Sequence, residues 1–242
     1  MRPQPGRATV AAALVHLFTA SGVVLALLMV HFAYAGQVRT VLGLYLLAML
    51  IDGTDGLLAR RFRVGEVLPQ IDGALLDNIV DYITYAFAPM ALLWANGYLP
   101  GGAAGLVWAA VPALASCYQF TRTDAKTDDH FFLGFPSYWN VVAFYVIVLG
   151  LTPAVTATLL AVLSVLVFVP IKYVYPSRTV TLWRTNMVLA ALWLVLYAVI
   201  TWQLPQPSPV LVALSLAYLV YYAAVSLWLT VRTRRLTAAP AA

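Results

Sequence analysis

Residues 52–81 read DGTDGLLARRFRVGEVLPQIDGALLDNIVD, and this stretch sets the arrangement of the rest of the chain. The 242-residue sequence has nine acidic residues, and six of them lie here. These six are Asp52, Asp55, Glu66, Asp72, Asp77 and Asp81. The sequence on both sides is strongly apolar, and carboxylates in such surroundings are costly and usually serve a function. We therefore take this stretch as the candidate site.

The composition is that of an integral membrane protein. The chain is 63% hydrophobic and 10% charged, whereas soluble domains average about 25% charged residues. The single cysteine, Cys117, excludes an intramolecular disulfide and a thiolate metal site. The pI of about 9.4 is explained by arginine-rich cytoplasmic loops rather than by nucleic acid as a partner. We expect an all-α polytopic membrane protein in contact with membrane lipids.

Apolar runs separated by turn residues predict eight helices, which form one membrane-embedded domain over residues 1–242. Their ranges are about 9–34, 38–61, 71–96, 102–121, 136–151, 153–171, 185–203 and 208–231. The stretch 136–171 has a rival interpretation as one long span. Basic residues on both sides of it, such as Arg122 and Lys172, favour two crossings with a short outer turn at Pro153.

The basic residues also orient the helices. Of the fourteen Lys and Arg residues, only Arg39 falls in a predicted outer loop. Those nearest the chain ends are Arg2, Arg7, Arg232, Arg234 and Arg235. The positive-inside rule therefore predicts that both termini and the acidic stretch face the cytoplasm. A signal peptide ending at Ala33-Tyr34-Ala35 is the alternative for the N-terminus, but the apolar run of about 25 residues exceeds the roughly 7–15 of a signal core.

Helical spacing places the acidic residues on two faces. One face of the helix over 38–61 carries Asp52, Asp55, Gly56, Ala59 and Arg60. One face of the helix over 71–96 carries Gly73, Asp77 and Asp81. At about 1.5 Å rise per residue, Asp52 and Asp81 each lie roughly 12 Å inward from the cytoplasmic ends of these faces. Two antiparallel helices can therefore bring four carboxylates together at one depth.

Four carboxylates in a low dielectric oppose each other's ionisation unless cations bind. Oxygen ligands select hard divalent ions such as Mg²⁺, Mn²⁺ or Ca²⁺. Small residues on the same faces leave room for a ligand. The combination of carboxylates, a metal ion and an arginine suggests that this ligand is a nucleotide diphosphate. The alternatives are acids paired with neighbouring arginines, a glycine-mediated packing motif, or the ion site of a cation transporter.

The pattern D-x2-D-G-x2-A-R followed by G-x3-D-x3-D resembles the signature of the CDP-alcohol phosphotransferases. Here it is formed by Asp52, Asp55, Gly56, Ala59, Arg60, Gly73, Asp77 and Asp81. The spacer departs from most of the family, because twelve residues separate Arg60 from Gly73. The extra length predicts an added helical turn in the elbow between the two helices. The long spacer, the eight spans and the segment 134–140 resemble the bacterial branch that uses choline as its acceptor.

The resemblance implies transfer of the phosphatidyl group of CDP-diacylglycerol to choline with release of CMP, in the bacterial inner membrane. It implies that Asp52, Asp55, Asp77 and Asp81 hold the metal, with two Mn²⁺ or Mg²⁺ ions. It also implies that Asp81 is the general base, and that a homodimer forms. Residues that would line the cytidine and diphosphate site are Gly56, Ala59, Arg60 and Gly73.

Choline carries a quaternary ammonium group, which aromatic ring faces and carboxylates recognise. The aromatic residues that we expect near the acceptor are Tyr82, Tyr85, Tyr138 and Trp139, although an interfacial aromatic belt explains such positions too. Asn140 is equally compatible with helix packing and with the site. The loop residues Asp124, Asp128, Asp129 and His130 are expected to be solvated, with an entry gate for the cationic choline as the alternative. Other acceptors, such as serine, glycerol phosphate or inositol phosphate, remain the alternative within the family.

Overall fold

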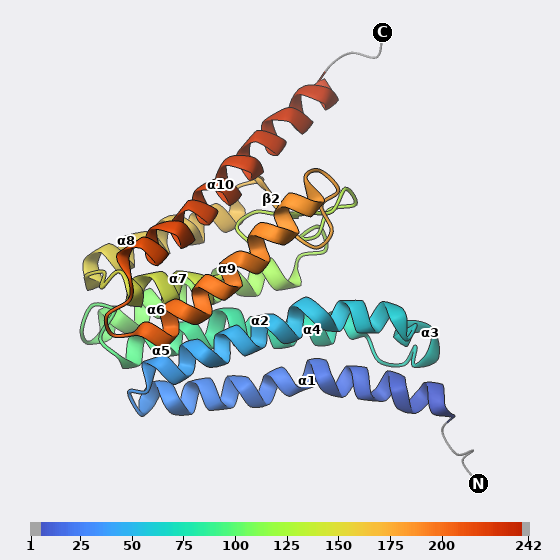
Figure 1. Cartoon of the computed structure of the whole chain (residues 1–242), viewed down its shortest axis with the longest axis horizontal. Helices are drawn as coiled ribbons and strands as arrows, with labels where there is room; N and C mark the ends of the chain where they lie inside the picture. Colours follow the sequence, from blue (N-terminus) through green and yellow to red (C-terminus); the bar gives the residue numbers. More distant parts are fainter. Residues whose placement is uncertain (1–5, 239–242) are drawn as a thin grey trace.

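The computed structural model describes residues 6–238, and the side chains of residues 6–233. Arg2 lies outside the described residues, as do the side chains of Arg234 and Arg235. The chain is a helical bundle with one short two-stranded ladder (Figure 1). The elements of the first half are α1 (Arg7–Tyr34), α2 (Val38–Arg61), α3 (Val64–Val67), α4 (Gly73–Asp81), the π-helix η1 (Tyr82–Phe87) and α5 (Ala88–Ala95).

The second half contains the ladder as well as helices. Its elements are α6 (Ala103–Thr121), β1 (Phe131–Leu133), α7 (Trp139–Val148), α8 (Pro153–Phe168), β2 (Lys172–Val174), α9 (Trp183–Gln203) and α10 (Pro209–Ala238). Strands β1 and β2 are antiparallel, with Phe132 opposite Tyr173. Each of the eight predicted helices corresponds to one helix or to one continuous run of helices, so the all-α polytopic class is confirmed.

Five helices within residues 6–238 are long and apolar enough to cross a membrane: α1, α2, α6, α9 and α10. Helices α7 and α8 are apolar but shorter. Large apolar side chains are exposed along the bundle, among them Leu27, Leu114 and Val195, as expected of surfaces that face lipid. The number of crossings and their sidedness stay predictions.

The predicted helix over 71–96 is interrupted by the π-helical turn η1. Pro89 follows in the first turn of α5. Proline has no N–H to donate to the carbonyl four residues earlier, at Tyr85, and its ring clashes with that carbonyl. A wider turn before Pro89 relieves this conflict, and π-turns are common at functional sites.

The helix predicted from residue 136 begins only at Trp139. Gly134 has φ +79°, and a Cβ there would lie 2.1 Å from the Val167 carbonyl oxygen. Ser137 also has a positive φ, so this stretch cannot be helical. The same close contact ties the start of α7 to the end of α8, next to the ladder.

Helix α1 packs against α2, α4, η1 and α5. At one contact a Cβ on Gly22 would come within 2.4 Å of Val80 Cγ1, so only glycine allows α1 to approach α4 this closely. The core on the other side of α2 contains stacked Phe144 and Tyr197 rings, whose centroids are 4.0 Å apart. The Tyr197 hydroxyl donates to the Leu42 carbonyl oxygen at 3.1 Å.

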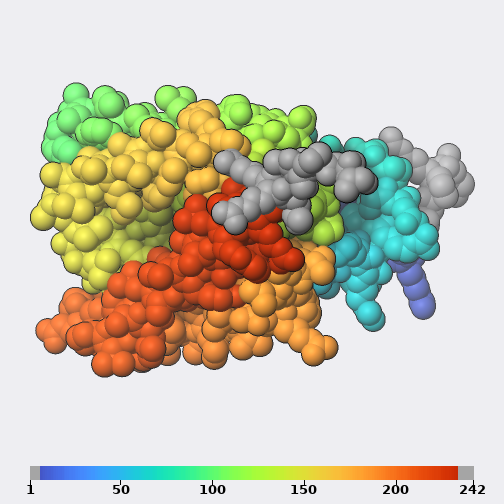
Figure 2. Space-filling model, turned by 90° about the horizontal axis from the view of Figure 1, so that it is seen from above, coloured from blue at the N-terminus to red at the C-terminus, as the bar shows by residue number. Residues whose placement is uncertain are grey.

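The start of α1, the elbow, the ladder and the end of α10 all lie at one end of the bundle (Figure 1). The elbow contains α3, which is the added helical turn that the long spacer predicts. It projects beyond the bundle at this end (Figure 2). The loop that joins α6 to β1 also lies at this end, so segments far apart in the sequence meet next to the acidic stretch.

Candidate active site

Three carboxylates from the two signature helices converge. One oxygen each of Asp52 and Asp55 on α2 and of Asp77 on α4 lie within 4.8 Å of one another. Asp55 is buried, and the other two are partly buried. Three carboxylate oxygens at this separation suit a hard divalent cation, which accepts oxygen ligands and neutralises their mutual repulsion. This triad can therefore hold a metal ion.

Each carboxylate of the triad has one donor from a different part of the chain. The Thr19 hydroxyl on α1 donates to Asp55 Oδ2 at 2.9 Å. The Tyr85 hydroxyl on η1 donates to Asp52 Oδ2 at 2.8 Å. The Lys126 ammonium, in the loop between α6 and β1, lies 3.4 Å from Asp77 Oδ2. These contacts orient the three carboxylates and leave their other oxygens for a ligand.

Asp81 lies one turn beyond Asp77 and outside the group of three. It ends α4 where the π-turn begins, and its charge interacts with those of Asp52 and Asp77. It is partly buried. The structure therefore separates a compact triad from a fourth carboxylate beside it, which the regular spacing in the sequence does not distinguish.

The small residues of the signature lie where close approach is needed. A Cβ on Gly73 would be 3.2 Å from His16 Cε1 on α1. A Cβ on Gly56 would be 3.4 Å from Arg60 Nη1, because the Arg60 guanidinium lies back along the helix. Ala59 packs against the apolar cluster that joins α1 to the elbow. Glycine and alanine at these positions thus keep α1, the elbow and Arg60 close to the triad.

The two other acidic residues of the stretch have local structural roles. Asp72 caps α4, because its Oδ1 accepts from the backbone N–H groups of Ala74 and Leu75, both at 3.0 Å. Glu66 forms an ion pair with Arg63 within the exposed elbow. An Asp directly before an apolar helical run is a common N-cap signal, so the role of Asp72 was readable in the sequence.

The four candidate aromatic residues are placed differently. The rings of Tyr85 and Tyr138 meet edge to face at 6.3 Å, next to Asp52. Tyr82 meets Phe120 instead, at 6.2 Å. Trp139 is fully buried, and its indole N–H donates to Ser116 Oγ at 2.7 Å. Asn140 is also buried, and within the described residues its amide has no hydrogen-bond partner.

Sequence reasoning missed Lys126, which it placed in a solvated acidic loop. Burial acts to lower the pKa of this lysine, but the charges of Asp77, Tyr175 and Asp81 act against it and the net shift is upward. Lys126 is therefore a cation beside the triad. Its neighbours in the sequence gave no signal of this, because the contact depends on how the loop is held by the ladder.

Comparison with known proteins places the chain in a family. No family model matches it. A phosphatidylcholine synthase from Legionella pneumophila is 40% identical over 227 residues, which cover 91% of this chain and 89% of that protein. Proteins of the same name from Pseudomonas aeruginosa and Borreliella burgdorferi are 36% and 33% identical, over 90% and 91% of this chain and 91% and 95% of theirs. The chain belongs to the phosphatidylcholine synthase family.

Membership of the phosphatidylcholine synthase family confirms the resemblance drawn from residues 52–81. The matched regions extend over most of the chain, so the likeness is far longer than the signature itself. In this phosphatidylcholine synthase fold the signature supplies the triad on α2 and α4. The segments outside the signature supply Thr19, Tyr85 and Lys126 as its neighbours.

Proposed function

We propose that the protein transfers the phosphatidyl group of CDP-diacylglycerol to choline and releases CMP, at the cytoplasmic side of a bacterial inner membrane. The observation that carries this proposal is the convergence of Asp52, Asp55 and Asp77 within 4.8 Å in a chain of the phosphatidylcholine synthase family. A cluster of oxygen ligands within membrane helices suits a diphosphate substrate whose acyl chains stay in the bilayer.

We infer that Asp52, Asp55 and Asp77 hold divalent metal, with Asp81 beside them, and that the ion is Mn²⁺ or Mg²⁺. The all-oxygen donor set of the triad supports a hard cation. A bound ion neutralises charge on the diphosphate and on the leaving CMP. Thr19 and Tyr85 keep the carboxylates of Asp55 and Asp52 in a fixed orientation through their hydrogen bonds.

We infer that Asp81 is the general base. The choline hydroxyl oxygen forms a bond to the phosphorus that carries diacylglycerol, and its proton passes to the Asp81 carboxylate. The bond from that phosphorus to the oxygen shared with the cytidine phosphate breaks, and CMP leaves with the electron pair. Asp81 suits this role because it lies next to the triad without being part of it.

The donor and acceptor are assigned to opposite sides of the triad. Arg60 lies along Gly56, where its guanidinium can pair with the diphosphate. Gly73 and Ala59 keep α1 and the elbow close to this side. For the acceptor we retain Tyr85 and Tyr138, which lie beside Asp52. Tyr82 and Trp139 are engaged with Phe120 and Ser116.

An acceptor panel tests the proposal. Purified protein in detergent is given CDP-diacylglycerol labelled in its cytidine, Mn²⁺, and in turn choline, serine, glycerol phosphate or inositol phosphate. We expect CMP release and phosphatidylcholine only with choline, and loss of both after chelation with EDTA. Release with a different alcohol but not with choline would contradict the assigned acceptor, and full activity in EDTA would contradict the metal.

A further inference from the structure

Four aromatic rings form a continuous row that begins at the proposed active site. Tyr85, whose hydroxyl bonds Asp52, meets Tyr138 at 6.3 Å. Tyr138 meets Phe132 edge to face at 6.1 Å. Phe132 stacks on Tyr175 with a centroid distance of 4.3 Å. The Tyr85 hydroxyl lies 2.8 Å from Asp52 Oδ2, so the row starts at the triad.

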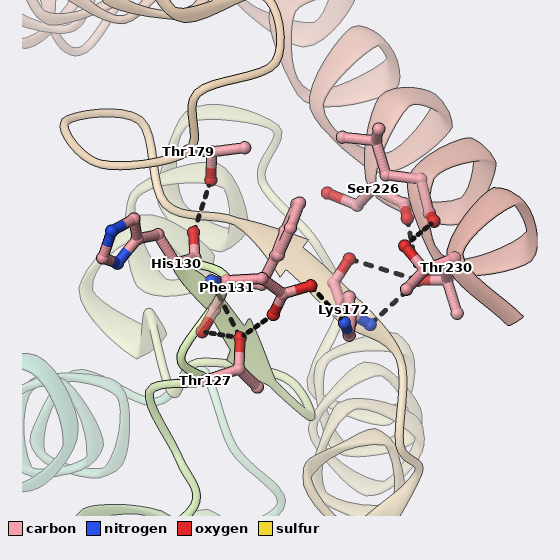
Figure 3. A network of polar contacts seen from close by, with 10 residues as sticks. Thr127, His130, Phe131, Lys172, Thr179, Ser226 and Thr230 are labelled. Carbon is pink, nitrogen blue, oxygen red and sulfur yellow. Dashed lines mark hydrogen bonds and ion pairs between the residues drawn. The ribbon is translucent and has the colours of Figure 1, made fainter. Parts of the chain in front are cut away.

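The last two rings come from the ladder, which is firmly held. Phe132 is in β1, and Tyr175 directly follows β2. Backbone N–H groups of β2 donate to side chains of α10: Lys172 to Thr230 Oγ1 at 2.9 Å and Val174 to Ser226 Oγ at 3.1 Å. Figure 3 shows the contact between Lys172 and Thr230. The Lys172 ammonium also forms an ion pair with Asp129. The strand that precedes Tyr175 is thus anchored on α10.

A second set of contacts ties the loop before β1 to the segment after β2. The Thr179 hydroxyl donates to the His130 carbonyl oxygen at 2.7 Å (Figure 3). The backbone N–H of Tyr175 donates to Thr179 Oγ1 at 2.8 Å. These hydrogen bonds connect the loop before β1 to the segment after β2, so Phe132 and Tyr175 are preorganised relative to each other. Preorganised groups bind a ligand without the cost of ordering them.

The far end of the row lies in the electrostatic field of the active site. Burial raises the pKa of the Tyr175 hydroxyl. The charge of Lys126 lowers this pKa, and the charge of Asp52 raises it further. Phe132, Tyr138 and Tyr175 are all partly exposed, unlike the rings of the core. The Tyr175 ring already receives one cation, because the Arg178 guanidinium carbon lies 5.8 Å from its centroid. Tyr85 is the buried end of the row at 4% exposed, and the other three rings are its accessible part.

We propose that Phe132 and Tyr175 complete the acceptor site as specificity-determining residues, and that the row they form with Tyr85 and Tyr138 takes the trimethylammonium group of choline. The inference rests on the proposed function and deepens it. A trimethylammonium group has no N–H, so ring faces and carboxylates are the groups that can hold it. With that group on the row, the hydroxyl end of the same small molecule points to Asp81 and the triad.

The test compares choline with 3,3-dimethylbutan-1-ol, a neutral alcohol of the same shape in which carbon replaces nitrogen. Phe132→Leu and Tyr175→Leu remove a ring, whereas Tyr175→Phe keeps it. Phe168→Leu is the matched control, because its exposed ring lies on Tyr118, away from the row. CMP release is measured over a range of each alcohol and of CDP-diacylglycerol, with thermal melting to confirm that each variant is folded.

We expect the KM for choline to rise about 3- to 30-fold in the two leucine variants, which corresponds to one cation–π contact. The KM for the neutral alcohol and for CDP-diacylglycerol should stay within about 2-fold. Tyr175→Phe, which keeps the ring, should reverse most of the rise in KM seen in Tyr175→Leu, and Phe168→Leu should match the wild type. Equal losses for both alcohols would show that the rings only pack the ladder and would overturn the inference, as would an unchanged KM for choline. If the wild type used another alcohol in place of choline, the proposed function itself would fail, and the two failures are thus distinguishable.

Discussion

Helices α2 and α4 and the β1–β2 ladder reach the same site in different ways. The helices place Asp52, Asp55 and Asp77 by regular spacing within a short stretch of chain. The ladder brings Lys126, Phe132 and Tyr175 there by pairing two loops and anchoring them on α10. One side of the site is thus encoded locally, and the other depends on contacts between distant segments.

The difference has a consequence for what each region does. The carboxylates suit metal and a diphosphate, which every member of a phosphotransferase family must bind, and a rigid pair of helices holds them. The loop that leads into the ladder places Lys126 beside Asp77, and we propose that the rings of the ladder recognise the trimethylammonium group of choline. We infer that the reaction is set by α2 and α4, and that the choice of acceptor is set by the ladder.

The largest effect is expected at Asp55. Asp55→Asn keeps the shape and an acceptor for the Thr19 hydroxyl but removes the charge of a proposed metal ligand. We expect a loss of activity of at least about 100-fold, because even the outer partners of metal ligands are worth 10–100-fold. Turnover as a function of Mn²⁺ concentration, together with thermal stabilisation by Mn²⁺, checks this. If Mn²⁺ stabilised the variant as much as the wild type, Asp55 would not be a metal ligand.

Asp81→Asn sharpens the distinction between the triad and its neighbour. A base that accepts the hydroxyl proton contributes typically 10²–10⁴-fold to turnover. We expect kcat to fall by about that factor while the affinity for CDP-diacylglycerol and Mn²⁺ changes little, since Asp81 lies outside the group of three. Nucleotide affinity and turnover measured on one preparation decide the matter. A parallel collapse of both would make Asp81 chiefly a metal ligand.

Lys126 is the point at which the ladder side touches the triad. Its ammonium competes with a metal ion for Asp77, so Lys126→Met should lower the Mn²⁺ concentration for half-maximal activity. We expect a shift of only about 2- to 5-fold, because the side chain is 46% exposed and solvent screens such a pair. Lys172→Met is the matched control, since its partner is Asp129. Equal shifts in both variants would point to net charge rather than to the contact.

The sequence was sufficient for the helices and the triad because both follow from periodicity. Apolar runs and turn residues predicted the helical segments. The D-x2-D and G-x3-D-x3-D spacings predicted that four carboxylates meet, and three of them form the triad. The long spacer predicted the extra turn, which is α3. Regular spacing could not show that Asp81 stands apart from the triad, because it places Asp77 and Asp81 on the same face of α4.

The ladder could not be predicted from local pattern. Three-residue strands have too little alternation to be read, and their pairing depends on Gly134 and on the side chains of α10. The helices expected over 136–151 and 153–171 therefore included residues that are extended or in turns. The role of Lys126 could not be predicted either, because its contact with Asp77 requires the ladder to hold the loop in place.

The smallest effect is expected within the acidic stretch itself, at Asp72. Its carboxylate caps α4 through the N–H groups of Ala74 and Leu75 and contributes no oxygen to the triad. Asp72→Ala should cost about 1 kcal/mol, seen as a fall in Tm of about 2–4 °C for a chain of this size. Asp72→Asn, whose side-chain oxygen can still accept the capping hydrogen bonds, should have the same Tm as the wild type.

Activity measurements on the same two variants distinguish the helix cap from the metal site. A lost cap frays the first turn of α4, but Asp77 lies one turn further in, where α1 packs against the helix. We therefore expect both variants to keep wild-type turnover and Mn²⁺ dependence at a temperature well below their melting. If Asp72→Asn instead lost activity as Asp55→Asn does, the division of the six acidic residues into chemical and structural ones would be wrong. Because the asparagine side chain keeps the capping hydrogen bonds and lacks only the negative charge, such a loss would place Asp72 in the metal site.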